Sequence, residues 1–379
     1  MQPVFWTLVA VLVYIYAGYP LVVWLVGRLF SQPVQRRDQL PTVSIIIAAH
    51  NEEATIERTL ENKLGLDYPR EQLEIIVVSD GSTDETDDIA AGFASQGVVC
   101  LRQDPRNGKT AALNLAAQRA TGEILVFADA NSLYERAAVR HLVANFADPS
   151  VGYVTGTLAY QSSDGSMTAS GCGLYMRYEN FIRRSETRVG SVVGVNGGID
   201  AVRRSLYEAM QPDDLPDLVL PLQVVKSGYR VVYEPAAMLA EHALGTPEDE
   251  YRMRVRVSLR SLWTIADMAG LLNVRRFGFF SIQLFSHKVL RYLAFVFILL
   301  LYACTLLLWN SGPLYQATFV AQTVCFVAAF FGYRAARRGV SSRFLAMPFY
   351  FALVNCAALH AAWKFLRGER PRIWTPRLG

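Results

Sequence analysis

Charged side chains are absent from three long stretches of this chain, and these stretches predict membrane helices. Residues 1–27, 292–333 and 344–363 contain no Asp, Glu, Lys or Arg. A helix needs about 20 apolar residues to cross a bilayer, so the first and third stretches each fit one span. The second stretch fits two spans, with a turn at residues 310–313. The pattern therefore predicts a polytopic membrane protein with a soluble middle region.

Between the apolar stretches, short β-branched runs alternate with segments of helical character. The runs expected to form strands are residues 42–48, 74–78, 98–102 and 123–127. The segments expected to form helices lie between them, at residues 53–64, 84–94 and 108–120. This alternation predicts an α/β fold with a mostly parallel sheet that is covered by helices on both faces.

Polar side chains follow the predicted strands at the edge where open parallel sheets bind ligands. Asp80 follows the second strand, while Asp129 and Asn131 follow the fourth and share a face if that segment is extended. Paired oxygens of this kind suit a hard divalent cation, which in turn binds phosphate oxygens. Lys109 opens a helix whose first N–H groups can also meet a phosphate. Together these residues predict a site for a nucleotide diphosphate donor.

Composition and charge narrow the class of protein further. Of 379 residues, 52% are hydrophobic and 18% are charged, which excludes a fully disordered chain. The net charge of +4 is too small to argue for a nucleic-acid partner. The 5 cysteines form no Cys-x-x-Cys pair, so neither a disulfide framework nor a zinc site is expected. The first positive charges, Arg28, Arg36 and Arg37, follow the first apolar stretch, and the positive-inside rule therefore places the middle region in the cytosol.

Four motifs of the middle region occur together and in order. They are Ser44–Glu53 (SIIIAAHNEE), Val78–Asp84 (VSDGSTD), Gly108–Asn114 (GKTAALN) and Phe127–Asn131 (FADAN). With these motifs the chain resembles the family 2 glycosyltransferases, and in particular the membrane-bound branch that includes synthases of chitin oligosaccharides, hyaluronan and cellulose. The resemblance implies a GT-A fold, which is the nucleotide-diphospho-sugar transferase fold, over residues 41–265. It also implies inverting transfer, which most of the family performs.

The resemblance implies roles for individual residues as well. The residues that would line the nucleotide site are Ala48, Asn51, Glu53, Asp80, Lys109 and Asp129. Asp129 and Asn131 would hold Mn²⁺ or Mg²⁺ through the phosphates. The family carries the motif Asp-x-Asp at this point, and this chain departs from it with Asn131 in place of the second Asp. The family's acidic pair ahead of a Gly-Tyr-Arg strand is closest to Pro216-Asp217-Leu218, with Pro in place of the first acid. This similarity assigns Asp217 as the general base, with Asp214 and then Asp213 as alternatives.

Two further groups of residues are assigned to the acceptor or to the donor diphosphate. Gly197 and Gly198 lie in a Gly-rich stretch that a sugar could approach closely, and a tight turn that demands glycines explains the stretch equally. Arg252, Arg256 and Arg260 recur every four residues and would share one face of a helix. They could bind the leaving diphosphate or anionic lipid headgroups. Processive members of the family carry Gln-x-x-Arg-Trp in this region, of which this chain keeps only Arg256.

The expected organisation has five parts. They are a transmembrane helix at 1–27, the GT-A domain at 41–265, amphipathic interface helices at 266–290, three transmembrane or re-entrant helices at 291–366, and a tail at 367–379. The expected location is the cell (inner) membrane, with several spans and a cytosolic catalytic domain. The expected partners are a nucleotide-sugar donor, by family habit a UDP-sugar, a saccharide or lipid-linked acceptor, the lipid bilayer, and a second copy or an accessory subunit.

The expected reaction is inverting sugar transfer in polysaccharide or glycolipid synthesis, with processive synthesis and translocation left open. One alternative is a non-catalytic membrane assembly or transport component with a degenerate transferase domain, which Asn131 and Pro216 favour. Against it, the ionisable residues that a transporter needs are absent from the bilayer-centred parts of the apolar stretches, with His360 as the one exception. A second alternative is a nucleotidyltransferase, but its Gly-rich phosphate loop is missing after the first strand, where residues 50–53 stand.

Overall fold

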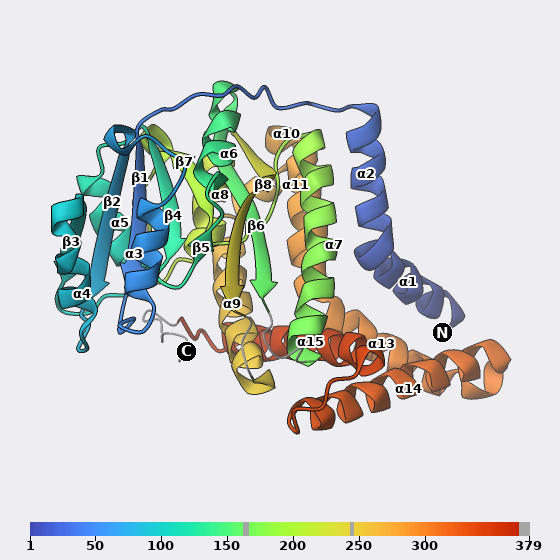
Figure 1. Cartoon of the computed structure of the whole chain (residues 1–379). Coiled ribbons are helices and arrows are strands. Elements are labelled where there is room, and N and C mark those ends of the chain that lie inside the picture. The colour runs from blue at the N-terminus through green and yellow to red at the C-terminus, as the bar shows by residue number, and fades with distance from the viewer. Residues whose placement is uncertain (162–166, 243–245, 371–379) are drawn as a thin grey trace. The chain divides into compact units, whose positions relative to one another are not determined.

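The chain forms two compact units, each assembled from segments that are distant in the sequence. The computed structural model describes residues 1–161, 167–242 and 246–370 (Figure 1). The first unit, called the helical unit below, is formed by Met1–Leu29, Tyr160–Ser185 and His242–Glu369. The second, called the sheet unit, is formed by Phe30–Ala159 and Glu186–Glu241 together with the chain from Arg370.

The sheet unit is built on eight strands. They are β1 (Val43–Ala49), β2 (Leu73–Asp80), β3 (Val98–Gln103), β4 (Ile124–Asp129), β5 (Leu133–Tyr134), β6 (Val151–Gln161), β7 (Asp200–Arg203) and β8 (Arg230–His242). Their order across the sheet is β3-β2-β1-β4-β7-β6-β8-β5. β1 pairs in parallel with both β2 and β4, and β2 pairs in parallel with β3. These four strands correspond to the four strands that the sequence pattern predicts.

The α/β class is therefore confirmed, but the expectation of a mostly parallel sheet is wrong for its second half. β7 runs antiparallel to both β4 and β6, and β5 runs antiparallel to β8. Antiparallel neighbours need no helical crossover between them. The regular spacing of strand and helix that reveals parallel strands is therefore missing after residue 129.

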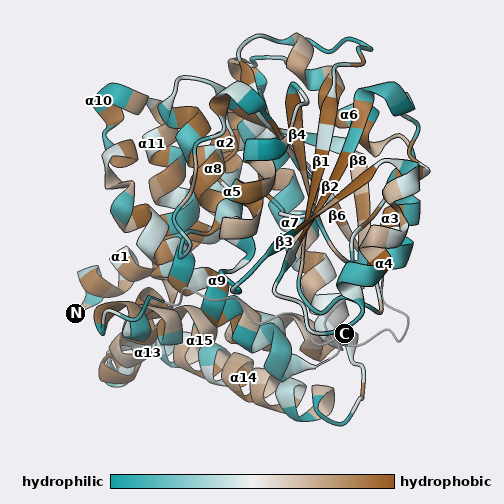
Figure 2. Cartoon of the chain, turned by 90° about the vertical axis from the view of Figure 1, so that its left-hand side faces the viewer, coloured by the Kyte–Doolittle hydropathy of each residue, from teal (hydrophilic) through white to brown (hydrophobic). Residues whose placement is uncertain are grey.

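Helices cover the sheet and complete its core. They are α3 (Ile56–Leu64), α4 (Thr86–Gly92), α5 (Lys109–Arg119), α6 (Ala138–Ala144) and α8 (Pro216–Lys226). The central strands are buried on both faces, and Ile45, Ile46, Ile47, Ile75 and Val77 are wholly inaccessible to solvent. Figure 2 shows these strands as a hydrophobic layer between more polar helices. Strands buried on both faces read as continuous apolar runs, which is why β1 and β2 are recognisable in the sequence.

The helical unit consists of helices that differ strongly in polarity. Its first segment is a continuous helix formed by α1 (Gln2–Val13), a π-helical turn (Tyr14–Gly18) and α2 (Tyr19–Leu29). The helices that follow are α7 (Met167–Val189, which continues into the sheet unit), α9 (Pro247–Asp267), α10 (Val274–Phe277), α11 (Phe279–Leu284), α12 (Leu290–Tyr292), α13 (Ala294–Leu307), α14 (Pro313–Ala336) and α15 (Arg343–Leu366). A second π-helical turn, Phe285–Val289, joins α11 to α12.

Three helices of this unit are long and apolar enough to cross a membrane. They are Gln2–Leu29, Pro313–Ala336 and Phe344–Leu366. A fourth candidate is the pair Phe279–Tyr292 and Ala294–Leu307, which is bent by 56° as in a broken span or a re-entrant loop. α14 leaves large apolar side chains such as Val324 exposed along its length. An exposed apolar surface of this kind fits contact with lipid.

Candidate functional site

Parallel pairing brings the polar strand ends of the sheet unit to one edge, as the sequence predicts. In the register of the sheet, Ala48 of β1 lies opposite both Val78 of β2 and Asp129 of β4. Asp80 is the last residue of β2, and Asp129 is the last residue of β4. The two carboxylates therefore lie on either side of the end of the central strand.

Asp80 is fixed by the loop that precedes α5. Its side chain is almost completely buried. One carboxylate oxygen accepts hydrogen bonds from the backbone N–H of Asn107 (2.8 Å) and from the Gln103 amide, and the other accepts the N–H of Gly108 (2.9 Å). Arg106 lies 3.6 Å from the second oxygen. Asp80 thus shapes the loop over the strand ends and holds the first turn of α5 in place.

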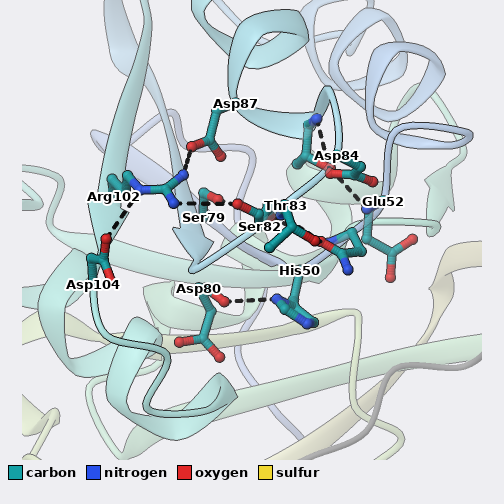
Figure 3. Close-up of polar contacts among 12 residues, drawn as sticks. His50, Glu52, Ser79, Asp80, Ser82, Thr83, Asp84, Asp87, Arg102 and Asp104 are labelled. Atoms are coloured by element: carbon teal, nitrogen blue, oxygen red, sulfur yellow. Dashed lines mark hydrogen bonds and ion pairs between the residues drawn. The ribbon is translucent and has the colours of Figure 1, made fainter.

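Asn51 and Glu53 join the loop after β1 to the loop after β2. The Asn51 side-chain oxygen accepts the N–H of Thr83 at 2.8 Å, and the Glu53 carboxylate accepts the N–H of Glu85 at 3.1 Å. Asn51 adopts a left-handed backbone conformation with φ of 54°, which Asn tolerates better than most residues. Figure 3 shows the side chains that line this junction, among them Ser82, Asp84 and His50.

His50 also connects the loop after β1 to the end of β2. Its Nδ1 lies 2.7 Å from the backbone carbonyl of Asp80, and the ring is buried. The backbone N–H of Asn51 donates to the Ser82 hydroxyl at 3.2 Å. The junction is therefore a rigid wall of the site, held mostly by contacts between side chains and backbone.

Lys109 and Asp129 form an ion pair at the open part of the strand edge. Lys109 is the first residue of α5, directly after Gly108. Its ammonium nitrogen lies 2.5 Å from one Asp129 oxygen. The Asp129 side chain is 33% exposed, so it is reachable from solvent, whereas Asp80 is not. A phosphate group could take the place of Asp129 as the partner of Lys109.

Two consecutive glycines bring the carboxylates of Asp129 and Asp217 toward the same point. Gly197 and Gly198 have φ of +70° and +72°, a conformation that favours glycine. A Cβ added at Gly197 would lie 2.6 Å from an Asp217 oxygen, and one added at Gly198 would lie 3.1 Å from an Asp129 oxygen. Any side chain at Gly197 would therefore collide with the Asp217 carboxylate.

The residues around this point line a small pocket. Lys109, Asp129, Gly198, Pro216 and Asp217 all contribute to its wall. Asp217 lies in the first turn of α8, which begins at Pro216. A carboxylate in the first turn of a helix is favoured by the unpaired N–H groups there. The structure thus brings Lys109, Asp129 and Asp217, which are far apart in the sequence, to one pocket.

The two alternatives to Asp217 have other partners. The Asp214 carboxylate accepts the backbone N–H of Gln211 at 2.8 Å and closes a turn ahead of α8. Asp213 lies 3.5 Å from the guanidinium of Arg370. Neither residue lines the pocket that contains Lys109 and Asp129. The geometry therefore favours Asp217 over both.

Buried groups that the sequence pattern did not single out complete the pocket. Tyr153 and Asp200 also line the pocket, and both are almost wholly buried. Burial raises the pKa of Tyr153 well above its ordinary value, and the carboxylates of Asp200 and Asp217 raise it further. The Tyr134 hydroxyl lies 2.7 Å from the carbonyl of Gly198 and 2.9 Å from that of Phe127. These contacts hold the glycine pair against the end of β4.

Helix α3 supports the loop after Asp129 from behind. The Thr59 hydroxyl donates to the carbonyl of Ala130 at 2.7 Å. The fully buried ammonium of Lys63 donates to the carbonyl of Ser132 at 2.6 Å and lies 3.7 Å from the centre of the Tyr134 ring. The pKa of Lys63 is lowered well below its ordinary value by burial, which the charge of Asp129 partly opposes. Lys63 follows Ile56 and Leu60 at helical spacing on the buried face of α3. This spacing is the signal in the sequence that could have marked Lys63 as buried.

The expected metal ligands are only partly assembled by the protein. Asp129 and the half-buried Asn131 would supply one carboxylate and one amide oxygen. Within residues 1–161, 167–242 and 246–370 there is no group of three His, Cys, Asp or Glu side chains that could hold a metal ion. Mg²⁺ is commonly bound by one or two carboxylates together with substrate phosphates. The residues present therefore fit a cation that the diphosphate of a donor would help to hold.

Arg252 and Arg256 are not among the residues that the sheet unit brings together. Both belong to α9 of the helical unit. The Arg252 side chain is largely exposed and lies 3.7 Å from Asp249, Arg256 is partly buried, and Arg260 is buried. The three do follow one helix face at four-residue spacing, as expected.

Comparison with known proteins gives a consistent picture of the sheet unit. Residues 44–210 match the model of the family described as "Glycosyl transferase family 2". The "Probable glycosyltransferase YdaM" of Bacillus subtilis is 29% identical over 229 residues, which cover 58% of this chain and 54% of that protein. The poly-β-1,6-N-acetyl-D-glucosamine synthase of Staphylococcus aureus is 27% identical over 241 residues, covering 59% of this chain and 58% of the synthase. The chain thus spans little more than half the length of these relatives.

One solved structure resembles nearly the whole chain. The mannosyltransferase PcManGT from Pyrobaculum calidifontis, solved in complex with GDP-mannose and Mn²⁺, matches with a TM-score of 0.71. The match covers 97% of this chain and 99% of that protein at 23% sequence identity. At this identity the similarity shows a shared fold, which confirms the GT-A architecture implied by the sequence.

Proposed function

We propose that this chain, of which residues 44–210 match the model of the family 2 glycosyltransferases, transfers a sugar from a nucleotide-diphosphate donor to a hydroxyl group with inversion at the anomeric carbon. The acceptor is a saccharide or a lipid-linked sugar. The observation that carries the proposal is the meeting of Asp129 and Asp217 at the adjacent glycines Gly198 and Gly197, beside Lys109.

Asp217 is the general base of the proposed reaction. Its carboxylate accepts the proton of the acceptor hydroxyl while that oxygen attacks the anomeric carbon from the face opposite the leaving group. The new bond joins the acceptor oxygen to the anomeric carbon, and the bond from that carbon to the diphosphate breaks. The nucleoside diphosphate leaves with the electron pair, and one attack gives inversion. Gly197 supports this role because its missing side chain leaves room for the carboxylate.

Lys109 and Asp129 bind the donor diphosphate. Lys109 exchanges its ion pair with Asp129 for a phosphate oxygen at the start of α5, where helix N–H groups also favour an anion. A divalent cation, Mn²⁺ or Mg²⁺, held by Asp129 and Asn131 together with the phosphates would neutralise the charge on the departing diphosphate. Asn51, Glu53 and Asp80 shape the loops on which the nucleoside rests.

The apolar helices support a location of the proposed reaction at a membrane. Three helices, or four if the bent pair is one span, are long and apolar enough to cross it. Arg28, Arg36 and Arg37 follow the first of them, so the catalytic domain lies on the cytosolic side of the cell membrane.

The proposal is tested with the full-length chain in detergent or nanodiscs. The protein is incubated with Mn²⁺ and a panel of UDP- and GDP-sugars, and the released nucleoside diphosphate is measured. We expect release from one donor, and a fall of about 10²–10⁴-fold in Asp217→Asn, which is the usual contribution of a general base. Donor affinity should be unchanged in this variant, because the base contacts the acceptor.

Asp213→Asn is the matched control, since Asp213 lies in the same segment but faces Arg370. It should keep nearly full activity. Full activity in Asp217→Asn, with the loss appearing instead in Asp213→Asn or Asp214→Asn, would overturn the assignment of the base. A folded protein that binds no nucleotide would overturn the proposed function and favour a degenerate domain.

A further inference from the structure

The helical unit contains a cavity of its own, of about 400 Å³. Its walls come from the first helix, from α7, from Ser258 of α9, from the bent pair at residues 279–307 and from α15. Two of these walls, the first helix and α15, are helices long and apolar enough to cross a membrane, and the bent pair is a further candidate span. A volume of this size falls in the range of sites that bind small organic ligands.

Most of the cavity wall is aliphatic or aromatic. The apolar part includes Leu174 of α7 and Met347, Phe351, Val354 and Ala358 of α15. Leu174 and Phe351 are each more than 40% exposed. Such a surface suits a hydrocarbon chain better than a sugar or a nucleotide, because it offers few hydrogen-bond partners.

Charged groups are gathered at another part of the same wall. Glu179 of α7 pairs with the guanidinium of Arg291, and its second oxygen lies 3.2 Å from the Nε2 of His287. Burial alone would raise the pKa of Glu179, but the charge of Arg291 and the contact with His287 outweigh it and hold the pKa well below its usual value. Glu179 is therefore ionised, and its charge is already balanced by Arg291.

Lys288 is the remaining cation of this wall. It is partly buried, and its ammonium makes no hydrogen bond and no ion pair with any residue of the described ranges, which omit only 162–166, 243–245 and 371–379. With Glu179 and Arg291 balancing each other, Lys288 leaves the cavity wall with a net charge of about +1. A cation beside an apolar wall is costly to leave without an anion.

We propose that this cavity binds a lipid with an anionic phosphate group, whose phosphate contacts Lys288 and whose hydrocarbon chain lies against Leu174, Phe351 and Ala358. The ligand class follows from the pairing of one unbalanced cation with an apolar wall among membrane-type helices. Two sources supply this chemistry, a bulk membrane phospholipid and a phosphate monoester of a long alcohol. The inference concerns the helical unit alone and does not depend on the proposed transferase activity.

The test measures lipid binding to the full-length chain in detergent by native mass spectrometry. The probes are phosphatidylglycerol and, as the uncharged match, diacylglycerol with the same chains. We expect phosphatidylglycerol to bind at least about tenfold more tightly than diacylglycerol, and Lys288→Gln to remove that difference, since a bond to a charged group contributes about this much. Lys226→Gln, which removes an exposed Lys of α8 in the sheet unit, should leave both affinities unchanged.

Variants that fill the cavity test the apolar part separately. Ala358→Phe should weaken both lipids about tenfold, because it takes the space of the hydrocarbon chain. If Ala358→Phe lowers the thermal midpoint, Leu174→Trp is used in place of Ala358→Phe. Leu174 is partly exposed, so a larger side chain there should destabilise the fold less. Binding of UDP to the sheet unit should be the same in all variants, which separates this test from that of the proposed function.

The outcomes distinguish a site from lipid that merely coats the helices. Equal binding of phosphatidylglycerol to the wild type and to Lys288→Gln, or equal binding of the two lipids to the wild type, would overturn the proposal. Unchanged binding in both cavity-filling variants would also overturn it. Competition of phosphatidylglycerol with hexadecyl phosphate then identifies the source, because the better fitted of the two displaces the other at equal concentration.

Discussion

Asp80 and Asp129 end two strands that flank the same central strand, yet the sheet unit uses the two carboxylates differently. Asp80 is 2% exposed, and backbone N–H groups of Asn107 and Gly108 bind its two oxygens. Asp129 is one-third exposed and pairs with the side chain of Lys109. The first region is thus closed by backbone contacts, and the second is open and held by a side-chain ion pair.

The difference distinguishes a carboxylate that is fixed within its loop from one that can exchange its partner for a ligand. A carboxylate that accepts several backbone N–H bonds cannot release them without unfolding the loop they belong to. An ion pair between two partly exposed side chains contributes little to stability, so it can be exchanged for a ligand. We therefore expect changes around Asp80 to act on stability, and changes around Asp129 and Asp217 to act on turnover.

The sharpest test of this comparison is Asp129→Asn. Nucleoside diphosphate release should fall by about 10²–10³-fold, as when one preorganised electrostatic group is removed from an active site. The thermal midpoint should fall by no more than about 3 °C, because a partly exposed ion pair contributes less than about 1 kcal/mol. Turnover and the unfolding midpoint are measured on the same detergent preparation. Retention of activity together with a large loss of stability would reverse the roles given to the two regions.

Gly197→Ala should reduce turnover by about a hundredfold, the effect of displacing a catalytic group by roughly 1 Å. The added Cβ would lie 2.6 Å from the Asp217 oxygen, so the carboxylate must move. Gly228→Ala is the matched control, because its φ of +87° imposes a similar backbone strain while no atom lies within 4 Å of its added Cβ. The two variants should lose similar stability. Equal losses of turnover would mean that backbone strain, and not the contact with Asp217, is responsible.

Asp80→Asn should act mainly on the fold. The amide would present N–H groups to the N–H donors of Asn107 and Gly108, leaving buried donors unsatisfied at a cost of about 2–3 kcal/mol. The thermal midpoint should fall by several degrees, while the protein that remains folded keeps measurable turnover. An unchanged midpoint with abolished turnover would place Asp80 in the same class as Asp129.

The strand ends of this site could be predicted from the sequence, because the parallel half of the sheet carries its own signals. β1 and β2 are apolar runs followed directly by polar residues, and parallel pairing places such ends together. The positions of Asp80, Lys109 and Asp129 at one edge of the sheet could accordingly be predicted from the sequence. The assignment of Asp217 needed the resemblance to a family, since its segment is an isolated acid ahead of an apolar run.

The contacts that complete the pocket could not be predicted in this way. Gly197 meets Asp217, and Gly198 meets Asp129, through folding of the antiparallel half, where no regular strand–helix spacing guides the alignment. A glycine motif in a sequence indicates backbone freedom but not which side chain uses the space. Lys63 was missed because a lysine is ordinarily assigned to the surface, and only the burial of its helix face reveals its role.

Asn131→Asp tests whether residue 131 contacts the metal beside Asp129. A second carboxylate beside Asp129 should tighten Mn²⁺ binding in the presence of UDP by about tenfold, or about 1.4 kcal/mol. Removal of the metal with EDTA should stop turnover in both the wild type and this variant, and added Mn²⁺ should restore it at a lower concentration in the variant. Equal Mn²⁺ requirements would show that residue 131 does not contact the metal.

The smallest expected effect concerns Lys63, which supports the loop behind Asp129. Its pKa in the folded chain is lowered by burial, whereas the unfolded chain has the ordinary value of about 10.4. Between these two values the unfolded state binds the extra proton, so this group makes the folded state more stable as pH rises. The contribution is at most about 1.4 kcal/mol per pH unit for one proton.

The measurement compares the stability of the wild type with that of Lys63→Met from pH 7 to pH 9. The difference should shift in favour of the wild type as the pH rises, and the same comparison with the exposed Lys226, replaced in Lys226→Met, serves as the control. A difference that does not depend on pH would mean that Lys63 keeps its proton in the folded chain. The charge of Asp129 would then outweigh the effect of burial on the pKa of Lys63.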